Sequence, residues 1–296
     1  MRARSPRHSV PYSHGRVHYY ETFLWVWSQI TPVMGNEDTG AGPNRGRSGT
    51  IKSLETSFTI VEYLQRESGG GGSEIAADTG LSKGTVHKHL ATLRKHDFVT
   101  KEDGTYRLGL RFLDVGGHVR DQFVGSKVVK QKTKELAEET GEVAMFGRLE
   151  HGYIVTAFRE SGPNGVPTNS RVGTRLPVHQ VAAGKAILAQ LPPERVDDII
   201  AAYGLPRATE ETITDPADLH RELAAIRERG HAYSYGESTP GVWTVAVPVI
   251  SPGGDVLGAC TVAAPKHRLT TEEFETELPS VVRSAVNEIE INIAYA

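Results

Sequence analysis

Five polar residues in the first third of the chain have the types and spacing that could read a nucleic acid. Ser82 is a good helix N-cap, and the apolar residues Val86, Leu90 and Leu93 then recur at helical spacing. The outward-facing set at the start of this helix is Ser82, Lys83, Thr85, Lys88 and His89. Short polar and basic side chains can hydrogen-bond to base edges in the major groove. The pattern therefore predicts that these residues contact DNA.

Two further cations lie on a hairpin expected directly after this helix. Asp103-Gly104 is a strong hairpin turn signal, and the residues after it alternate like a strand. Lys101 and Arg107 lie on opposite sides of the turn, where we expect them to position DNA through its phosphates. A helix, a glycine turn and another helix also occur in ordinary all-α domains. The basic second helix and the hairpin favour a winged helix-turn-helix instead.

The surrounding elements would position these residues. A helix is expected from Ile51, with a short helix over 73–78 that ends at Thr79-Gly80. The glycine-rich stretch 68–72 between them reads as a flexible loop. The segment 110–124 reads as a connecting helix, with a hinge at Gly116-Gly117.

Residues 126–296 show the pattern of an antiparallel sheet covered by helices. Strand-like runs at 143–149 and 153–159 flank the turn Glu150-His151-Gly152, and the runs at 243–250 and 256–263 flank another turn. Helices are expected over 126–139, 193–202 and 215–229, with a short one over 182–191 that Pro192-Pro193 closes. Thr270 and Glu273 form a capping box for a last helix, which Pro279 should interrupt. The fold class is therefore α+β.

Composition limits the function classes. The chain has 296 residues, of which 38% are hydrophobic, and this suits two domains with separate cores. The single cysteine, Cys260, excludes a disulfide framework or a cysteine-rich zinc site, and the 12 histidines are scattered, so we expect neither a metal nor a cofactor. A reducing, cytoplasmic location follows.

The first 49 residues differ in kind from the rest and read as a disordered or mis-annotated extension. They lack a folding pattern, and we expect the working protein to start at Met34. The apolar run Phe23 to Ile30 is too short to span a bilayer, so no membrane partner is expected.

Six blocks in order resemble the isocitrate lyase regulator (IclR) family of winged-helix transcription regulators. The blocks are SLETSFTIVEYL, LSKGTVHKHLATL, YRLGLRFLDVGG, PVHQVAAGKAILAQLP, the pair ITDPADL and LAAIRERG, and GVWTVAVPVISPGGDVLGACTVAAP. The wording of ETSFTIVEYL and VNEIEINIAY is most similar to the haloarchaeal branch. The resemblance implies a winged helix-turn-helix at 50–110, a linker helix at 111–125 and a GAF-like effector-binding domain at 126–296.

The same resemblance implies a ligand-responsive repressor or activator of a metabolic operon, with operator DNA, a small effector and other copies of itself as partners. By motif position, the effector pocket should be lined by Ala182, Ala183, Ser234, Thr244, Thr261 and Ala263, with Leu176 and Val242 as its apolar wall. Hydroxyl groups stand at Ser234 and Thr244, where family members often carry an acid and a cysteine. We therefore expect a small organic acid or hydroxyl-bearing metabolite. The alternative for Ala182-Ala183-Gly184 is that small residues let the helix lie close to the sheet.

Two other functions stay open at this point. An enzyme is one, but neither a phosphate loop nor a G-x-S-x-G elbow is present, and Lys185 reads as a helix-surface or helix-end residue rather than a nucleophile. The other is an oligomeric DNA-binding scaffold that senses nothing.

Overall fold

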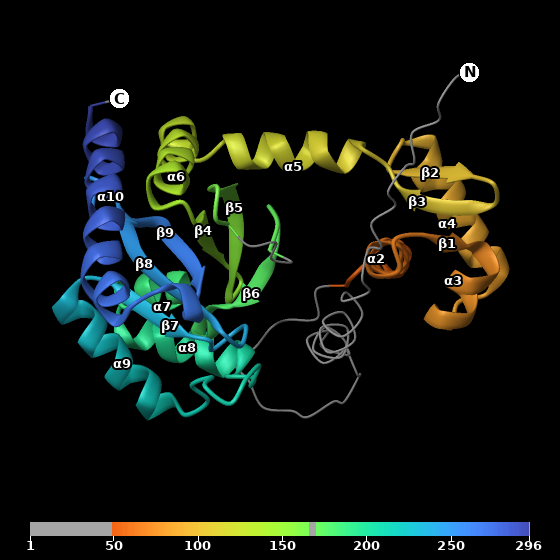
Figure 1. Cartoon of the computed structure of the whole chain (residues 1–296). Coiled ribbons are helices and arrows are strands. Elements are labelled where there is room, and N and C mark those ends of the chain that lie inside the picture. The colour runs from red at the N-terminus through yellow and green to blue at the C-terminus, as the bar shows by residue number, and fades with distance from the viewer. Residues whose placement is uncertain (1–48, 166–169, 296) are drawn as a thin grey trace, which may run out of the picture. The chain divides into compact units, whose positions relative to one another are not determined.

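The computed structural model describes residues 49–165 and 170–295 (Figure 1). Apart from Gly49, the extension at 1–49 and the expected start at Met34 lie outside the described residues. The described N-terminal part contains three helices and a small sheet. Its elements are α2 (Lys52–Arg66), β1 (Gly70–Gly71), α3 (Gly72–Thr79), α4 (Lys83–Lys95), β2 (Val99–Glu102) and β3 (Thr105–Leu108).

One compact core joins these elements. Ile60 and Leu64 of α2 pack with Ile75 of α3 and with Val86 and Leu90 of α4, and all five side chains are buried. The α3–α4 turn closes at Gly80, whose φ of 69° is the left-handed conformation that glycine adopts without steric cost. The β2–β3 hairpin turns at Asp103 and Gly104, both with positive φ. This arrangement is a winged helix-turn-helix.

The glycine-rich stretch forms a strand, so the expectation of a simple flexible loop was wrong. Gly70 and Gly71 pair with Tyr106 and Thr105, which makes β1 the third strand of the small sheet, in the order β1-β3-β2. A Cβ atom on Gly70 would lie 2.8 Å from the Tyr63 ring. Glycine is needed here because the backbone passes directly over that ring.

The β2–β3 hairpin is the wing of this motif. Helix α5 (Arg111–Asp121) follows it and runs without a break through Gly116-Gly117. None of its residues is buried, and Leu113 and Val119 are 71% and 62% exposed. The glycine pair therefore does not interrupt the helix, although a hinge was expected there.

The C-terminal part is built on one six-stranded antiparallel sheet in the order β6-β5-β4-β9-β8-β7. The strands are β4 (Val143–Glu150), β5 (Tyr153–Ser161), β6 (Arg175–Pro177), β7 (Ala232–Tyr235), β8 (Val242–Ile250) and β9 (Val256–Pro265). The helices are α6 (Ser126–Thr140), α7 (Ala182–Leu188), α8 (Pro193–Tyr203), α9 (Pro216–Arg229) and α10 (Leu278–Ala294), with short 3₁₀ turns at Val178–Gln180 and Lys266–Arg268.

The helices cover the two faces of this sheet in separate layers (Figure 1). Helices α6 and α10 pack on one face, around Phe146, Val245 and Val262. Helix α7, with α8 and α9 outside it, packs on the other face, around Ala246 and Ala259. Because successive strand residues point to opposite faces, alternate residues along β8 and along β9 contribute to different cores.

The interruption expected at Pro279 is a π-helical segment, Glu273–Glu277, directly before α10. Proline has no N–H to donate to the carbonyl four residues earlier, which is that of Glu275. The Tyr233 hydroxyl donates to this carbonyl oxygen at 2.9 Å instead. The capping box at Thr270 and Glu273 is also present: the Thr270 N–H donates to Glu273 Oε2 at 2.7 Å, and the Glu273 N–H donates to Thr270 Oγ1 at 3.2 Å.

Candidate nucleic-acid interface and effector site

The second helix of the helix-turn-helix, α4, presents a basic outer face. Lys83 and Lys88 are exposed, as are Arg94 and Lys95 in its last turn. Ser82 caps the helix, because its Oγ accepts the Thr85 N–H at 3.1 Å, and the two hydroxyl oxygens lie 2.9 Å apart. The N-cap that the sequence predicted is therefore present, and it engages the hydroxyl groups of Ser82 and Thr85 with each other.

His89 lies differently from the other residues expected to contact DNA. It is half-buried, and its Nδ1 lies 2.8 Å from Ser57 Oγ on α2. His87, which the sequence argument left out, is exposed on the same helix. The apolar spacing could have identified this difference. At 100° per residue, position 89 lies closer than position 87 to the stripe formed by Val86, Leu90 and Leu93.

The wing carries its two cations as expected. Lys101 and Arg107 are exposed on β2 and β3. The Lys101 ammonium lies 4.8 Å from the centre of the Tyr106 ring, a cation–π distance that holds the side chain along the hairpin. Glu102 and Asp103 stand at the turn, so the positive charge lies on the two strands and not at the tip.

Strand pairing brings three of the residues expected in the effector site into one row. Ser234 on β7 pairs with Thr244 on β8, and Thr244 pairs with Ala263 on β9. Thr261 stands in the adjacent row, between Ala246 and Met145. These side chains share the sheet face covered by α7, where Ala182 and Ala183 are the first two, buried residues of the helix.

The apolar wall expected from Leu176 and Val242 is divided between the two ends of the sheet. Leu176 lies on β6 at one edge, and Val242 lies on β8 beside the other edge. Both are half-buried. The two residues therefore do not form one continuous wall. Sequence reasoning also missed Arg159, which pairs with Met145 and so belongs to the row of Thr261. The alternation along β5 was the signal that could have identified it.

Gly184 supports the packing interpretation of the Ala182-Ala183-Gly184 segment. A Cβ atom at Gly184 would lie 1.8 Å from the Val178 carbonyl oxygen. This residue therefore allows close approach of α7 to the turn that precedes it. One polar group on the facing strand is nevertheless unsatisfied: Thr261 Oγ1 is buried and has no hydrogen-bond partner among residues 49–165 and 170–295.

Lys185 stands in the last turn of α7, at a helix end as expected, but it is buried and does not lie on the helix surface. Its side chain is 2% exposed, and Nζ lies 2.5 Å from Glu237 Oε1 and 3.9 Å from Glu222 Oε1. Glu222 in turn pairs with Arg229 at 2.6 Å. Burial raises the pKa of the Glu237 carboxyl, and the Lys185 charge opposes that rise. A buried lysine is tolerated here because carboxylates compensate it.

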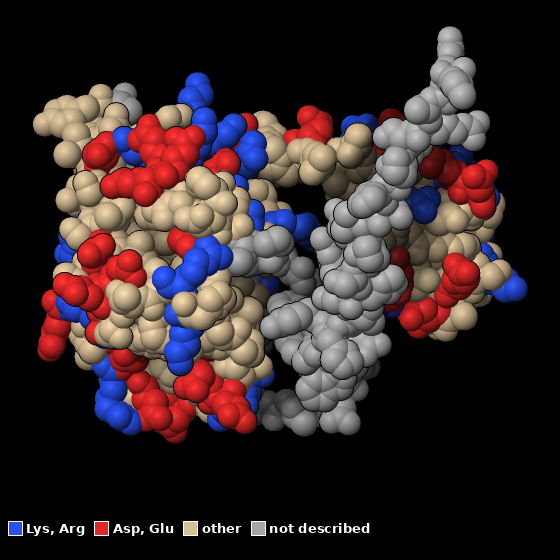
Figure 2. Space-filling model, viewed as in Figure 1, with Lys and Arg blue, Asp and Glu red and all other residues tan. Residues whose placement is uncertain are grey.

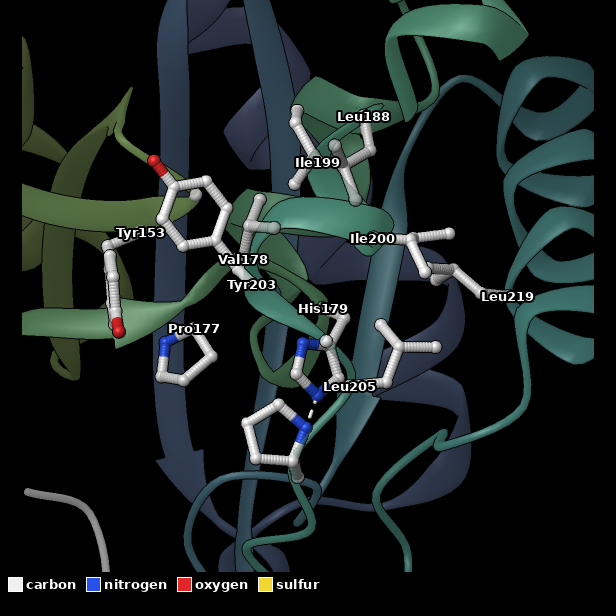
Figure 3. Close-up of a pocket in the computed structure, with 13 residues that line it drawn as sticks. Tyr153, Pro177, Val178, His179, Leu188, Ile199, Ile200, Tyr203, Leu205 and Leu219 are labelled. Atoms are coloured by element: carbon white, nitrogen blue, oxygen red, sulfur yellow. Dashed lines mark hydrogen bonds between the residues drawn. The ribbon is translucent and has the colours of Figure 1, made fainter. Parts of the chain in front are cut away.

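A small cavity of about 20 Å³ lies beside α8 (Figure 3), and neither Ser234 nor Thr244 lines it. Val178, Leu188, Ile199 and Leu205 are among its lining residues, and this volume suits about one water molecule. His179 Nε2 lies 3.0 Å from the Pro206 carbonyl oxygen, and burial lowers the pKa of this imidazole. With the volume of about one water molecule, the cavity is too small for a metabolite.

Charge is distributed differently on the C-terminal part. On the face shown in Figure 2, lysine and arginine side chains alternate with aspartate and glutamate over this domain. Such a surface offers no continuous basic track to a duplex on that face. Among the described residues, no group of three or more His, Cys, Asp or Glu side chains could hold a metal ion, and no helix is long and apolar enough to cross a membrane.

A winged helix-turn-helix followed by a helix-covered antiparallel sheet defines a transcriptional regulator with a separate C-terminal domain. Residues 53–103 match the IclR helix-turn-helix domain, and residues 126–291 match the bacterial transcriptional regulator IclR C-terminal domain. The chain belongs to the IclR family of transcriptional regulators.

Relatives and solved structures agree with this assignment. The chain is similar to a probable HTH-type transcriptional regulator ArcR of Halobacterium salinarum, with 30% identity over 86% of this chain and 98% of that protein, as the haloarchaeal resemblance implied. Its fold resembles that of the Thermotoga maritima IclR structure, with a TM-score of 0.70, 26% identity, and coverage of 83% of this chain and 100% of that one. An IclR homolog from Microbacterium hydrocarbonoxydans complexed with 4-hydroxybenzoate has the same fold, with a TM-score of 0.70, 24% identity, and coverage of 82% and 100%.

Proposed function

We propose that this regulator binds operator DNA through α4 and the wing, and that a small metabolite bound in the C-terminal domain changes its DNA affinity. The start of α4 would enter the major groove, with Ser82, Lys83, Thr85 and Lys88 as the residues expected there. His89, also expected there from the sequence, is half-buried beside them against Ser57. Lys101 and Arg107 would hold the phosphates. The exposed cations on α4 and on both wing strands support this assignment. Because its target is chromosomal DNA, we expect the protein to act in the cytoplasm.

The effector site that we propose lies between the start of α7 and the strands β7, β8 and β9. The residues concerned are Ala182, Ala183, Ser234, Thr244, Thr261 and Ala263, with Leu176 and Val242 at its margins. The observation that carries this proposal is the buried hydroxyl of Thr261, which has no partner within the part of the chain that the structure describes. Leaving such a group unsatisfied costs about 1–3 kcal/mol, which a bound ligand with a hydrogen-bonding group would recover.

The effector class that fits these groups is a small organic acid, with or without hydroxyl groups. Ser234 and Thr244 can donate or accept hydrogen bonds, and the guanidinium of Arg159 in the row of Thr261 suits a carboxylate. The 4-hydroxybenzoate bound by the Microbacterium homolog combines both groups, which accords with this choice.

We further propose that the working form is a homodimer or tetramer. Ile51, Leu54 and Phe58 at the start of α2 are between 54% and 64% exposed, and α5 exposes Leu113 and Val119. Apolar side chains in such density on two helices are typical of an interface. Two copies would also supply the two recognition helices that tight operator binding requires. Sedimentation equilibrium distinguishes the two assemblies from a monomer.

An enzyme is a poorer fit to the same geometry. The Lys185 amine is buried and paired with Glu237 and Glu222, so it is not presented to a substrate as a nucleophile would be. A scaffold that senses nothing would leave the Thr261 hydroxyl without a role.

The experiment is a thermal-shift screen of organic acids on the parent, on Thr261→Val and on Thr244→Val. Thr59→Val, an exposed threonine of α2, is the matched control. We expect an acid that stabilises the parent and the control, and whose affinity falls about fivefold or more in both site variants, since each lost hydrogen bond is worth about 1 kcal/mol. A ligand that binds both site variants as tightly as the parent would place the effector pocket elsewhere.

A further inference from the structure

We infer that His87, and not His89, is the histidine that contacts DNA, and that His89 is a positioning residue that sets α4 on α2 through Ser57. This inference refines the proposed DNA-binding face and rests on it. It concerns the two histidines of α4 that lie two residues apart, so that a helix directs them about 200° from each other.

The hydrogen bonds of Ser57 determine what His89 does. The Ser57 hydroxyl donates to the Ser53 carbonyl oxygen at 3.1 Å, and its oxygen lies 2.8 Å from His89 Nδ1. A hydroxyl has one proton, so once it is given to Ser53 the oxygen can only accept. With this assignment of the hydroxyl proton, His89 donates from Nδ1, and its ring is tied to the side of α2. This contact holds the recognition helix at one rotation against the helix behind it.

His87 has the opposite surroundings. It is exposed and lies one helical turn after Lys83 and directly before Lys88, both of which are exposed too. Within 49–165 and 170–295, no side-chain hydrogen bond or ion pair is recorded for it. Ser82 and Thr85, by contrast, direct their hydroxyl groups to each other at the helix cap. Lys83, His87 and Lys88 are thus the available long polar side chains in the first two turns of α4.

The chemistry of an exposed imidazole suits base reading. A neutral imidazole offers one N–H donor and one acceptor, and the major-groove edge of each base pair offers a distinct set of such groups. A lysine at the same place reads bases with less geometric restriction, because its ammonium is a point charge on a flexible stem. His87 would therefore contribute sequence preference, while its lysine neighbours contribute mainly affinity.

The test uses duplexes that the parent protein selects from a pool of random-sequence 30-base-pair DNA. Selection is repeated with His87→Ala, His89→Ala and Ser57→Ala, and the affinity of each variant for the parent's selected duplex is measured by fluorescence anisotropy. His96→Ala, an exposed histidine at the C-terminal end of α4, is the matched control. Melting temperatures establish that each variant is folded, and His87→Gln replaces His87→Ala if the alanine variant is not.

We expect His87→Ala to lose the preference at one base pair of each half-site, from about tenfold or more to about twofold or less. His89→Ala should keep the selected sequence but bind it about tenfold more weakly, and Ser57→Ala should cause the same loss. Because the two residues act through one contact, the double variant should be no weaker than either single variant. His89→Asn, which retains an N–H donor near the place of Nδ1, should regain most of the affinity.

Three results would overturn the inference. One is a changed base preference in His89→Ala with an unchanged preference in His87→Ala. Another is a double variant in which the Ser57 and His89 losses multiply. The third is His87→Ala behaving like His96→Ala. A parent protein that selects no sequence at all would instead refute the proposed DNA-binding face as a whole.

Discussion

Replacing Lys185 with methionine tests how the buried ion pair stabilises the C-terminal domain. Methionine keeps the length of the apolar stem but removes the charge, which leaves the Glu237 carboxylate, 7% exposed, without its cation. Removing one partner of a buried pair typically costs about 3–5 kcal/mol of unfolding free energy. We expect a loss in this range in urea denaturation. The matched control is Lys134→Met, whose pair with Glu138 is exposed on both sides and contributes less than about 1 kcal/mol.

The pH dependence of this loss has a definite sign. Burial raises the pKa of Glu237 above its ordinary 4.5, and loss of Lys185 removes the charge that opposes this rise. A carboxyl group with a raised folded-state pKa binds more protons in the folded protein than in the unfolded one. Its contribution to stability therefore falls as pH rises from 4.5 through the folded-state pKa. The Lys185→Met loss should be larger at pH 8 than at pH 5, and Glu237→Gln in the same chain should recover part of it at pH 8. A loss no larger than that of Lys134→Met, or one independent of pH, would refute the buried-charge explanation.

Two glycine variants, one arginine variant and the single cysteine have expected outcomes. Gly70→Ala should lower the unfolding free energy of the DNA-binding domain by about 1–3 kcal/mol, because its Cβ would meet the Tyr63 ring at 2.8 Å. Gly84→Ala, with space around it inside α4, should be neutral or stabilising, and equal effects of the two changes in a melting experiment would contradict this packing argument. Arg107→Ala should weaken binding to all duplexes and lower the salt dependence by about one charge in an anisotropy titration, and an unchanged slope would mean that the wing does not contact phosphate. Cys260 should resist thiol reagents in the folded protein, since burial raises the pKa of its thiol to about 12, and rapid labelling under native conditions would contradict that burial.

Much of the local structure could be predicted because it depends on residues close in sequence. The Ser82 cap, the Asp103-Gly104 hairpin turn, the tight turn before Tyr153 and the capping box at Thr270 each involve contacts within a few residues. Side-chain chemistry and allowed φ values decide such contacts almost alone. The family resemblance added the expectation that the C-terminal domain binds an effector.

Only the tertiary structure decided which distant residues meet. Lys185 pairs with Glu237, 52 residues later, and His89 contacts Ser57, 32 residues earlier. The sheet order places Ser234, Thr244 and Ala263 in one row, yet it puts Leu176 at the far edge from Val242. Hydrophobic periodicity tells which face of a helix or strand is buried, but it does not tell what packs against that face. Register and partners depend on the packing of the whole chain, which is why the exposed face of α4 was predictable and the contact of His89 with Ser57 was not.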